Sequence, residues 1–140
     1  MLSLKIITPN KVIFDDKSVE SVTLPTATGE ITVLPKHIPL FTLLKEGVVE
    51  VKKKGGKEYF AIGGGYFETD GEKAILLVSR AFGQDEINQK LLEQAIKQAE
   101  ETLKKAVSEE ERKRAQALLR RSLIDRDLFY KLQKRRKRTL

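Results

Sequence analysis

The sequence predicts an all-β sandwich followed by an antiparallel two-helix hairpin. Short runs of alternating apolar and polar residues, separated by turn residues, fill residues 1–83, as is typical of a sandwich or barrel. After Gly83 the apolar residues recur at helical spacing instead. A single capping signal then divides this helical part in two. We therefore expect a β-sandwich domain at residues 1–83 and an α-helical hairpin with a basic tail at residues 84–140.

The N-terminal domain is expected to contain about ten short strands, bounded by local turn signals. Pro9-Asn10 and Asp15-Asp16 are expected to end the first two strands, and Pro25 to end the next. Gly55-Gly56 predicts a tight hairpin, because glycine tolerates positive φ at both turn positions. The clearest strand patterns cover residues 2–6, 11–14, 22–24, 29–34, 41–44, 47–53, 57–62, 66–69 and 73–79.

The helical part is expected to form two amphipathic helices joined by a short loop. The first has a length of about 30 Å at ~1.5 Å per residue. Ser108 and Glu111 form a capping box that begins the second helix. The apolar face of the first helix is Ile87, Leu91, Leu92, Ala95, Ile96, Ala99, Leu103, Ala106 and Val107. The inward positions expected on the second are Ala115, Leu118, Leu119, Ser122 and Leu123.

Composition excludes several classes of protein. The 140 residues suffice for one domain, or one with an appendage. Because the chain has no cysteine, a disulfide framework, a thiolate metal site and a cysteine nucleophile are excluded. No apolar run approaches ~18 residues, so we expect no transmembrane helix. The N-terminal residues lack a long apolar segment, so we expect no secretory signal.

The net charge of +7 is concentrated at the C-terminus. Residues 131–140 contain six lysines and arginines and no carboxylate. Such a tail is able to bind nucleic acid phosphates, or to steer the chain toward an acidic protein surface, or simply to remain solvated. Phe129 and Tyr130 are the only nearby aromatic residues for base stacking, and no base-reading motif is present.

The single histidine, His37, lies in a proline-shaped corner within residues 28–47. Pro35 and Pro39 exclude a helix here, so the corner is either a functional loop or a plain turn. No second histidine and no nucleophile-elbow serine accompany His37, and the nearest carboxylate, Glu30, lies across the corner. These residues favour a contact or packing role, and we expect no catalytic residue and no metal.

Residues 63–65 are three consecutive glycines, which invite comparison with a phosphate-binding loop. Such a loop needs a helix directly after the glycines, together with a lysine and a hydroxyl residue. Here Tyr66, Phe67 and Glu68 continue as a strand. We therefore expect a bulge or a close backbone approach instead.

Two segments resemble the epsilon subunit of bacterial F-type ATP synthases. Residues 29–47, GEITVLPKHIPLFTLLKEG, carry the spacing of that family's signature, and AIGGGYFE at residues 61–68 resembles its second landmark. The opening LKIITP at residues 4–9 and the closing helical hairpin also match. The matching signature positions are Gly29, Pro35, His37, Pro39, Leu40, Leu44 and Gly47.

The resemblance implies a non-catalytic subunit of the central stalk, which couples proton-driven c-ring rotation to ATP synthesis. Its implied partners are the gamma subunit, the c-ring and the alpha and beta subunits, with no nucleic acid. It implies a peripheral membrane protein on the cytoplasmic face of the inner membrane. The implied c-ring and gamma contacts are Glu30, His37, Ile38, Pro39 and Leu40. The alternative from a different class is a free nucleic-acid-binding module that uses the basic tail.

The resemblance also implies that the hairpin folds against the sandwich, or opens along gamma and inhibits ATP hydrolysis. The residues implied to meet an acidic segment of the beta subunit are Arg112, Arg114, Arg120, Arg121 and Arg126. Some bacterial members bind ATP through the pattern Ile/Leu-Asp-x-x-Arg-Ala, which would start here at Ile87 and Asn88. Because asparagine and two leucines replace the pattern's carboxylate, arginine and alanine, we expect no bound ATP and no cofactor. Residues 124–140 are also more basic than the family pattern requires.

Overall fold

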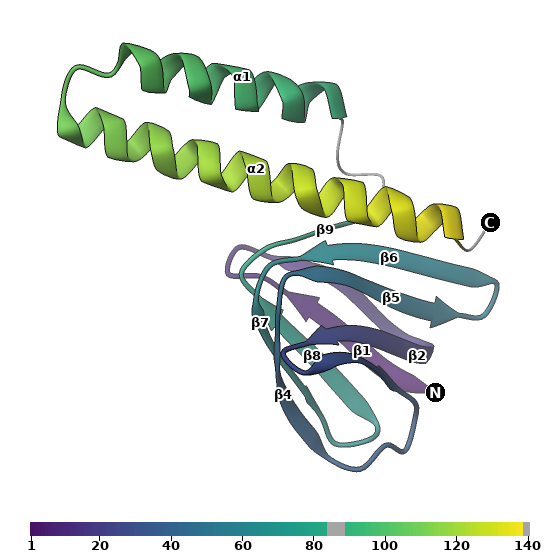
Figure 1. Cartoon of the computed structure of the whole chain (residues 1–140). Helices are drawn as coiled ribbons and strands as arrows, with labels where there is room; N and C mark the ends of the chain where they lie inside the picture. The colour runs from purple at the N-terminus through teal and green to yellow at the C-terminus, as the bar shows by residue number, and fades with distance from the viewer. Residues whose placement is uncertain (84–88, 139–140) are drawn as a thin grey trace.

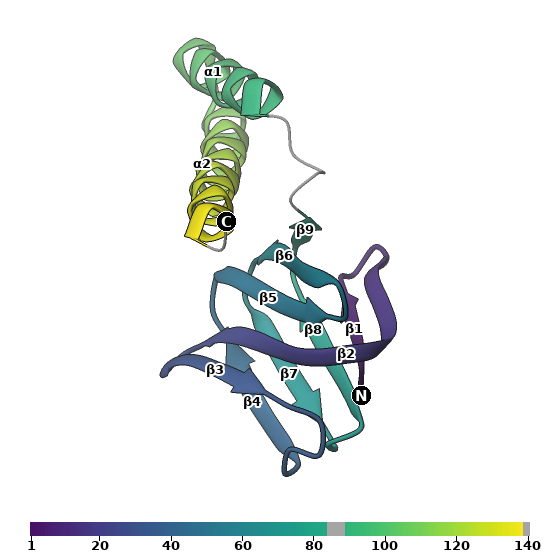
Figure 2. The same cartoon turned by 90° about the vertical axis from the view of Figure 1, so that its right-hand side faces the viewer.

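The chain folds into a β-sandwich with a two-helix hairpin lying along one side (Figure 1). The computed structural model describes residues 1–83 and 89–138, with side chains described through Arg135. Figure 2 shows two packed layers of strands, with the helices stacked above the layer that contains β5 and β6. The predicted fold class is therefore confirmed.

Nine strands and two helices make up the described part of the chain. The strands are β1 Leu2–Ile7, β2 Val12–Thr26, β3 Gly29–Val33, β4 Leu40–Leu44, β5 Gly47–Lys53, β6 Gly56–Ile62, β7 Gly65–Thr69, β8 Lys73–Val78 and β9 Ala81–Gly83. The helices are α1 Gln89–Lys105 and α2 Glu109–Arg138.

The strands pair in the order β1-β8-β7-β4-β2-β5-β6-β9, with β3 on β2. Only β1 and β8 are parallel among the described pairs. The first half of β2 pairs with β1, and its second half pairs with β3 and β5. This one long strand therefore belongs to both layers and joins them along one side.

The length of β2 corrects two predicted strand ends. Asp15-Asp16 does not end a strand, because the ladder with β1 continues through both aspartates. Nor does Pro25, which remains paired opposite Glu30 and accepts a hydrogen bond from the N–H of Lys45 at 3.0 Å. Proline lacks only the donor, so its carbonyl still serves the ladder. The strands predicted at residues 11–14 and 22–24 are therefore one continuous strand, β2. The strand β9 was not predicted.

The core lies between the layers and follows the predicted alternation, with Leu2, Leu4 and Ile6 of β1 fully buried. The glycines at 63–65 mark a close backbone approach, as expected. A Cβ on Gly65 would lie 2.0 Å from the carbonyl oxygen of Leu77 on β8. Only glycine therefore allows β7 and β8 to pair at this point.

The capping box at the start of α2 is confirmed. Oγ of Ser108 accepts a hydrogen bond from the N–H of Glu111 at 3.1 Å. The Glu111 carboxylate accepts the N–H of Val107 at 3.2 Å, one residue before the position that the motif predicts. α1 ends at Lys105, so its 17 residues are shorter than the predicted helix. Val107 lies in the link and is 90% exposed.

The predicted inward faces of both helices are only partly correct. α1 and α2 bury Ile96, Ala99, Ala115 and Ser122. In contrast, the positions predicted inward but found exposed are Leu91, Val107, Leu118 and Leu123. The physical reason is that α2 changes neighbour along its length. α1 runs along α2 as far as Tyr130, which donates a hydrogen bond to Glu93, and from Ile124 onward α2 also packs on the sandwich, so it does not bury one face throughout (Figure 1).

Candidate protein-interaction surfaces

The corner between β3 and β4 is rigid and presents apolar side chains outward. The N–H of Lys36 donates to the carbonyl of Gly71 at 2.8 Å, which ties the corner to the β7–β8 turn. The half-buried His37 donates from Nδ1 to the carbonyl of Ile38 at 2.7 Å, since a carbonyl only accepts. Ile38 is 75% exposed and Pro39 is also exposed. This corner suits contact with a partner better than chemistry.

The structure does not bring all five predicted contact residues together. His37 to Leu40 form the corner, but Glu30 stands at the start of β3. Its carboxylate accepts two hydrogen bonds from the guanidinium of Arg135 on α2, at 2.9 and 3.1 Å. Among the described residues, Glu30 thus pairs with the hairpin rather than with His37.

A second surface, which sequence reasoning missed, is the outer face of β4, β7, β8 and β1. Leu43 lies opposite Tyr66, Tyr66 opposite Leu77, and Leu77 beside Ile7 in the strand register. The rings of Phe41 and Tyr66 stack with centroids 5.7 Å apart. Leu43 remains 58% exposed and Phe41 63% exposed. We call this surface the apolar face: Ile7, Phe41, Leu43, Tyr66, Ile75 and Leu77.

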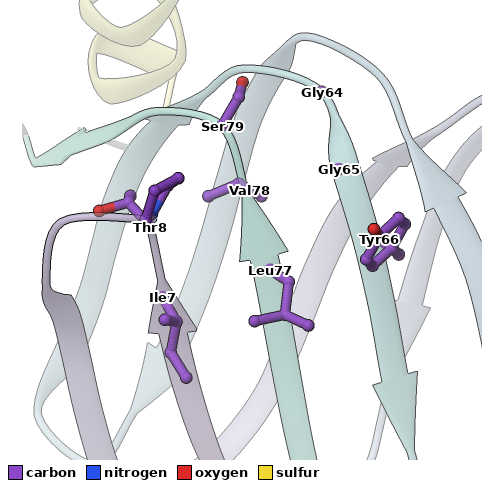
Figure 3. A pocket seen from close by; sticks show the side chains of 9 residues that line it. Ile7, Thr8, Gly64, Gly65, Tyr66, Leu77, Val78 and Ser79 are labelled. Carbon is purple, nitrogen blue, oxygen red and sulfur yellow. The ribbon is translucent and has the colours of Figure 1, made fainter.

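The apolar face ends in a shallow hollow of about 490 Å³ beside the glycine segment (Figure 3). The side chains of Ile7, Tyr66 and Leu77 lie along it from three neighbouring strands. Its lining is Ile7, Thr8, Pro9, Gly64, Gly65, Tyr66, Leu77, Val78 and Ser79. An exposed apolar surface of this extent is typical of a protein interface. The sequence did contain a sign of this surface, because β4 has large apolar residues on both of its faces. A strand with one face in solvent usually has polar residues on that face.

Among the described residues, those in the last part of α2 hold the hairpin to the sandwich. Leu128 is fully buried and Leu132 nearly so, against Tyr59 and Ala61 of β6. Asp125 also forms a half-buried ion pair with Arg80. The partly buried residues around this contact are Val48, Phe82 and Ile124. α1 lies on the side of α2 that faces away from the sandwich, so the last part of α2 attaches both helices (Figure 1).

A cluster of charged residues lies at one end of the contact between α2 and the sandwich. Arg135 reaches Glu50 at 3.5 Å as well as Glu30, and Lys57 pairs with Glu50 at 2.9 Å. The hydroxyl of Tyr59 donates to Glu50 at 3.3 Å. Burial alone would raise the pKa of Glu50, but Lys57, and then Arg135, lower that pKa below its usual value. The carboxylate therefore stays ionised and holds α2.

We expect hairpin docking to weaken as the pH falls through the lowered pKa of Glu50. Of the two cations that lower this pKa, Lys57 belongs to β6 and stays when α2 leaves, whereas Arg135 belongs to α2. Docking therefore gains stability from the interaction of ionised Glu50 with Arg135, and this gain is lost on acidification. The groups that face the carboxylate are Lys57, Tyr59 and Arg135, and Glu30 shares Arg135. Spin labels on Lys54→Cys and Gln133→Cys would report the docked fraction of the full chain between about pH 7 and about pH 3. An equal acid step in a Glu50→Gln variant would contradict this assignment.

The five arginines implied to contact the beta subunit are spread along α2 and face outward. Arg112, Arg114, Arg120 and Arg121 are exposed, and Arg126 is partly exposed. Arg114 lies 3.8 Å from Glu110, and Arg126 lies 3.7 Å from Glu93 of α1. They are distributed along and around α2, so they do not form one compact site.

Ile87 and Asn88 lie outside the part of the chain that the structure describes. Within residues 1–83 and 89–138, no three His, Cys, Asp or Glu side chains group as metal ligands would. The same residues include no helix long and apolar enough to cross a membrane.

The sequence is similar to those of ATP synthase epsilon chains. The sequence profile of the ATP synthase delta/epsilon chain β-sandwich domain matches residues 1–84. The ATP synthase epsilon chain of Sulfurovum sp. (strain NBC37-1) is 44% identical over 112 residues, which cover 77% of this chain and 84% of that one. The epsilon chain of Geotalea uraniireducens (strain Rf4) is 38% identical over 124 residues, covering 88% and 89%.

Two solved structures share the fold. A chain of the Euglena gracilis mitochondrial ATP synthase structure, described as OSCP/F1/c-ring, superposes with a TM-score of 0.61 at 24% identity, covering 89% of this chain and 78% of that chain. A chain of the Tetrahymena thermophila central stalk and c-ring gives 0.57 at 16% identity, covering 93% and 94%. The sandwich profile and the relatives that span most of the chain together show that this protein belongs to the ATP synthase delta/epsilon family, among the epsilon chains.

Proposed function

We propose that the chain is a non-catalytic subunit of the central stalk, which couples c-ring rotation to ATP synthesis. The observation that carries this proposal is the apolar face, which the hairpin leaves uncovered on the other layer of the sandwich. A family member that works inside a rotary complex needs such a surface to grip a neighbour. The fold is also shared by a chain from a structure described as central stalk and c-ring.

The two surfaces suit two different partners. The apolar face offers aromatic and aliphatic side chains on rigid strands, the composition of a stable interface core, and we assign it to gamma. The corner at residues 34–39 presents Ile38 and Pro39 on a fixed loop, and we assign it, with His37 and Leu40, to the c-ring. Glu30, at the other end of β3, is assigned to the same partner as a separate contact. Attachment to the ring would make the chain a peripheral membrane protein on the cytoplasmic face.

The hairpin is proposed to inhibit ATP hydrolysis after it leaves the sandwich and reaches the alpha and beta subunits. Its outward arginines are already solvated in the docked state, so release costs them little electrostatic interaction. Release does expose Leu128 and Leu132, which gives the docked state an apolar restoring contribution. A partner therefore shifts this balance only by binding the released hairpin better.

Replacing Arg120, Arg121 and Arg126 by alanine is expected to weaken inhibition about tenfold, because charge pairing guides such an encounter. The measurement is ATP hydrolysis by epsilon-depleted enzyme, titrated with the variant chain. The matched control removes three exposed positive charges from α1, at Lys97, Lys104 and Lys105. Inhibition that is equal in both triple variants would point to steric blocking.

A further inference from the structure

The outer surface of β4, β7, β8 and β1 is apolar at one end and charged further along the strands. The strand register gives two successive rows of outward side chains across these four strands. The row beside the glycine segment is Leu43, Tyr66, Leu77 and Ile7. The next row is Phe41, Glu68, Ile75 and Lys5, which includes one carboxylate and one ammonium group. The apolar end, where the hollow lies, therefore has the composition of the core of an interface, and the charged row that of its rim.

The hollow exists because the glycine segment contributes backbone without side chains. Gly64 and Gly65 lie along it and present main chain to the space beside them (Figure 3). The N–H of Ser79 donates to the carbonyl of Gly64 at 3.0 Å, and the N–H of Gly63 donates to the carbonyl of Arg80 at 3.0 Å. These bonds hold the segment against the end of β8. The hollow is thus formed before any partner binds, which lowers the cost of binding.

The chemistry of the lining selects an uncharged occupant. Among the described residues that line the hollow, none is charged. Leu77 is 44% exposed and Tyr66 is 46% exposed, so both still have apolar surface to offer. The stack of the Tyr66 ring on Phe41 fixes the orientation of that ring. A charged group placed here would lose hydration and find no opposite charge, whereas an apolar side chain would gain contact.

We propose that the hollow is an anchor site for gamma, which receives one aromatic or branched aliphatic side chain of that subunit beside Gly64. The inference rests on the proposed function, which assigns the apolar face to gamma. A few apolar or aromatic anchors in preformed pockets provide most of the binding energy of a protein interface. The hairpin packs on β5 and β6, in the other layer of the sandwich, so the hollow is open while the hairpin is docked (Figure 2).

The anchor site is tested first by placing a side chain in it. We expect Gly64→Leu to weaken binding of the full chain to epsilon-depleted ATP synthase at least about thirtyfold, because a leucine there takes up part of the hollow. The sandwich accepts the new Cβ, since its nearest atom is the carbonyl oxygen of Leu44 at 3.6 Å. Gly64→Ala imposes the same backbone restriction with one added carbon, and it should stay within about threefold of the parent chain.

Binding is measured by co-sedimentation titration, and urea unfolding of each variant verifies that the sandwich is intact. Equal affinities of Gly64→Leu and Gly64→Ala would overturn the anchor site.

A second comparison uses two outward residues of β8, where truncation leaves the core unchanged. Leu77 lines the hollow, whereas Ile75, two positions earlier on the same face, lies outside the lining. We expect Leu77→Ala to weaken binding about tenfold and Ile75→Ala no more than about threefold. A loss for Ile75→Ala as large as that for Leu77→Ala would show that the apolar face binds evenly, and would overturn the anchor site.

The chemistry of the anchor is tested by charging the lining. Leu77→Glu and Leu77→Lys should both bind the enzyme more weakly than Leu77→Ala, since neither charge meets an opposite charge on an uncharged anchor. Tighter binding by either variant would identify an anchor of the opposite charge and would overturn the assigned occupant.

The identity of the occupant is tested with a photoreactive group on Ser79→Cys, an exposed residue of the lining. The chain has no native cysteine, so the group is site-specific. We expect the bound chain to cross-link to gamma. A cross-link to the c-ring instead would overturn gamma as the occupant. A parent chain that does not bind the enzyme would overturn the proposed function, whereas binding that Gly64→Leu leaves unchanged would overturn the anchor site alone.

Discussion

A chain that ends at Gly83 is expected to assemble with the ATP synthase and to leave ATP hydrolysis uninhibited. The main core consists of sandwich residues alone, and the apolar face lies on the same strands. The described contacts that the hairpin adds are the apolar one around Leu128 and Leu132 and the ion pairs of Asp125 and Arg135. Its removal should therefore spare the partner surfaces while deleting every arginine that is proposed to inhibit.

The measurement is ATP hydrolysis and proton-coupled ATP synthesis by epsilon-depleted enzyme reconstituted with either chain. The full-length chain should lower hydrolysis, whereas the shortened one should restore coupling without doing so. Co-sedimentation with the enzyme confirms that the shortened chain is bound. Should the bound, shortened chain inhibit as strongly as the full chain, the hairpin is not the inhibitor.

Gly65→Ala is expected to lower the free energy of unfolding of the sandwich by at least about 3 kcal/mol. The new methyl group would lie 2.0 Å from the carbonyl oxygen of Leu77 and 2.8 Å from Cα of Val78. Both are backbone atoms, so no side-chain rotation relieves the clash. β7 and β8 would have to separate where they support the apolar face.

The matched control is Gly64→Ala, one position earlier. There the nearest atom to the new methyl group is the carbonyl oxygen of Leu44, at an ordinary 3.6 Å. We expect a change within about 1 kcal/mol of the parent chain. Urea unfolding followed by circular dichroism measures both variants, and equal midpoints would show that the β7–β8 pairing tolerates the added carbon.

Local chemistry explains which elements were predictable from the sequence. The glycine-rich segment and the Ser108 capping box were identified correctly because each depends on residues within a few positions. The ends of β2 were not, because pairing with β1 and β3 overrides the turn preference of Asp15-Asp16 and Pro25. Tertiary pairing outweighs local propensity in such a strand.

Of the interaction surfaces, too, one was predictable from the sequence and others were not. The rigid corner around His37 was predictable because two prolines define it. The contact between Glu30 and Arg135 was not, since nothing in the sequence distinguishes Arg135 from its five basic neighbours in the tail. Among the basic side chains of the tail that the structure describes, Arg135 is the one that the docking of α2 brings to Glu30. The apolar face likewise becomes visible once the strand register aligns side chains from four strands.

The one-ended attachment of α2 gives the hairpin the mechanics of a lever. From Leu128 to the start of the helix at Glu109 the arm is about 28 Å long, at ~1.5 Å per residue. A tilt of about 10° at the anchored end therefore moves the distant tip by roughly 5 Å. Conversely, a small force on the tip produces a large torque at the attached end, because the torque grows with the length of the arm. A rotor subunit with such a hairpin responds to contacts made at the tip of α2, far from the surface of the sandwich that holds the helix.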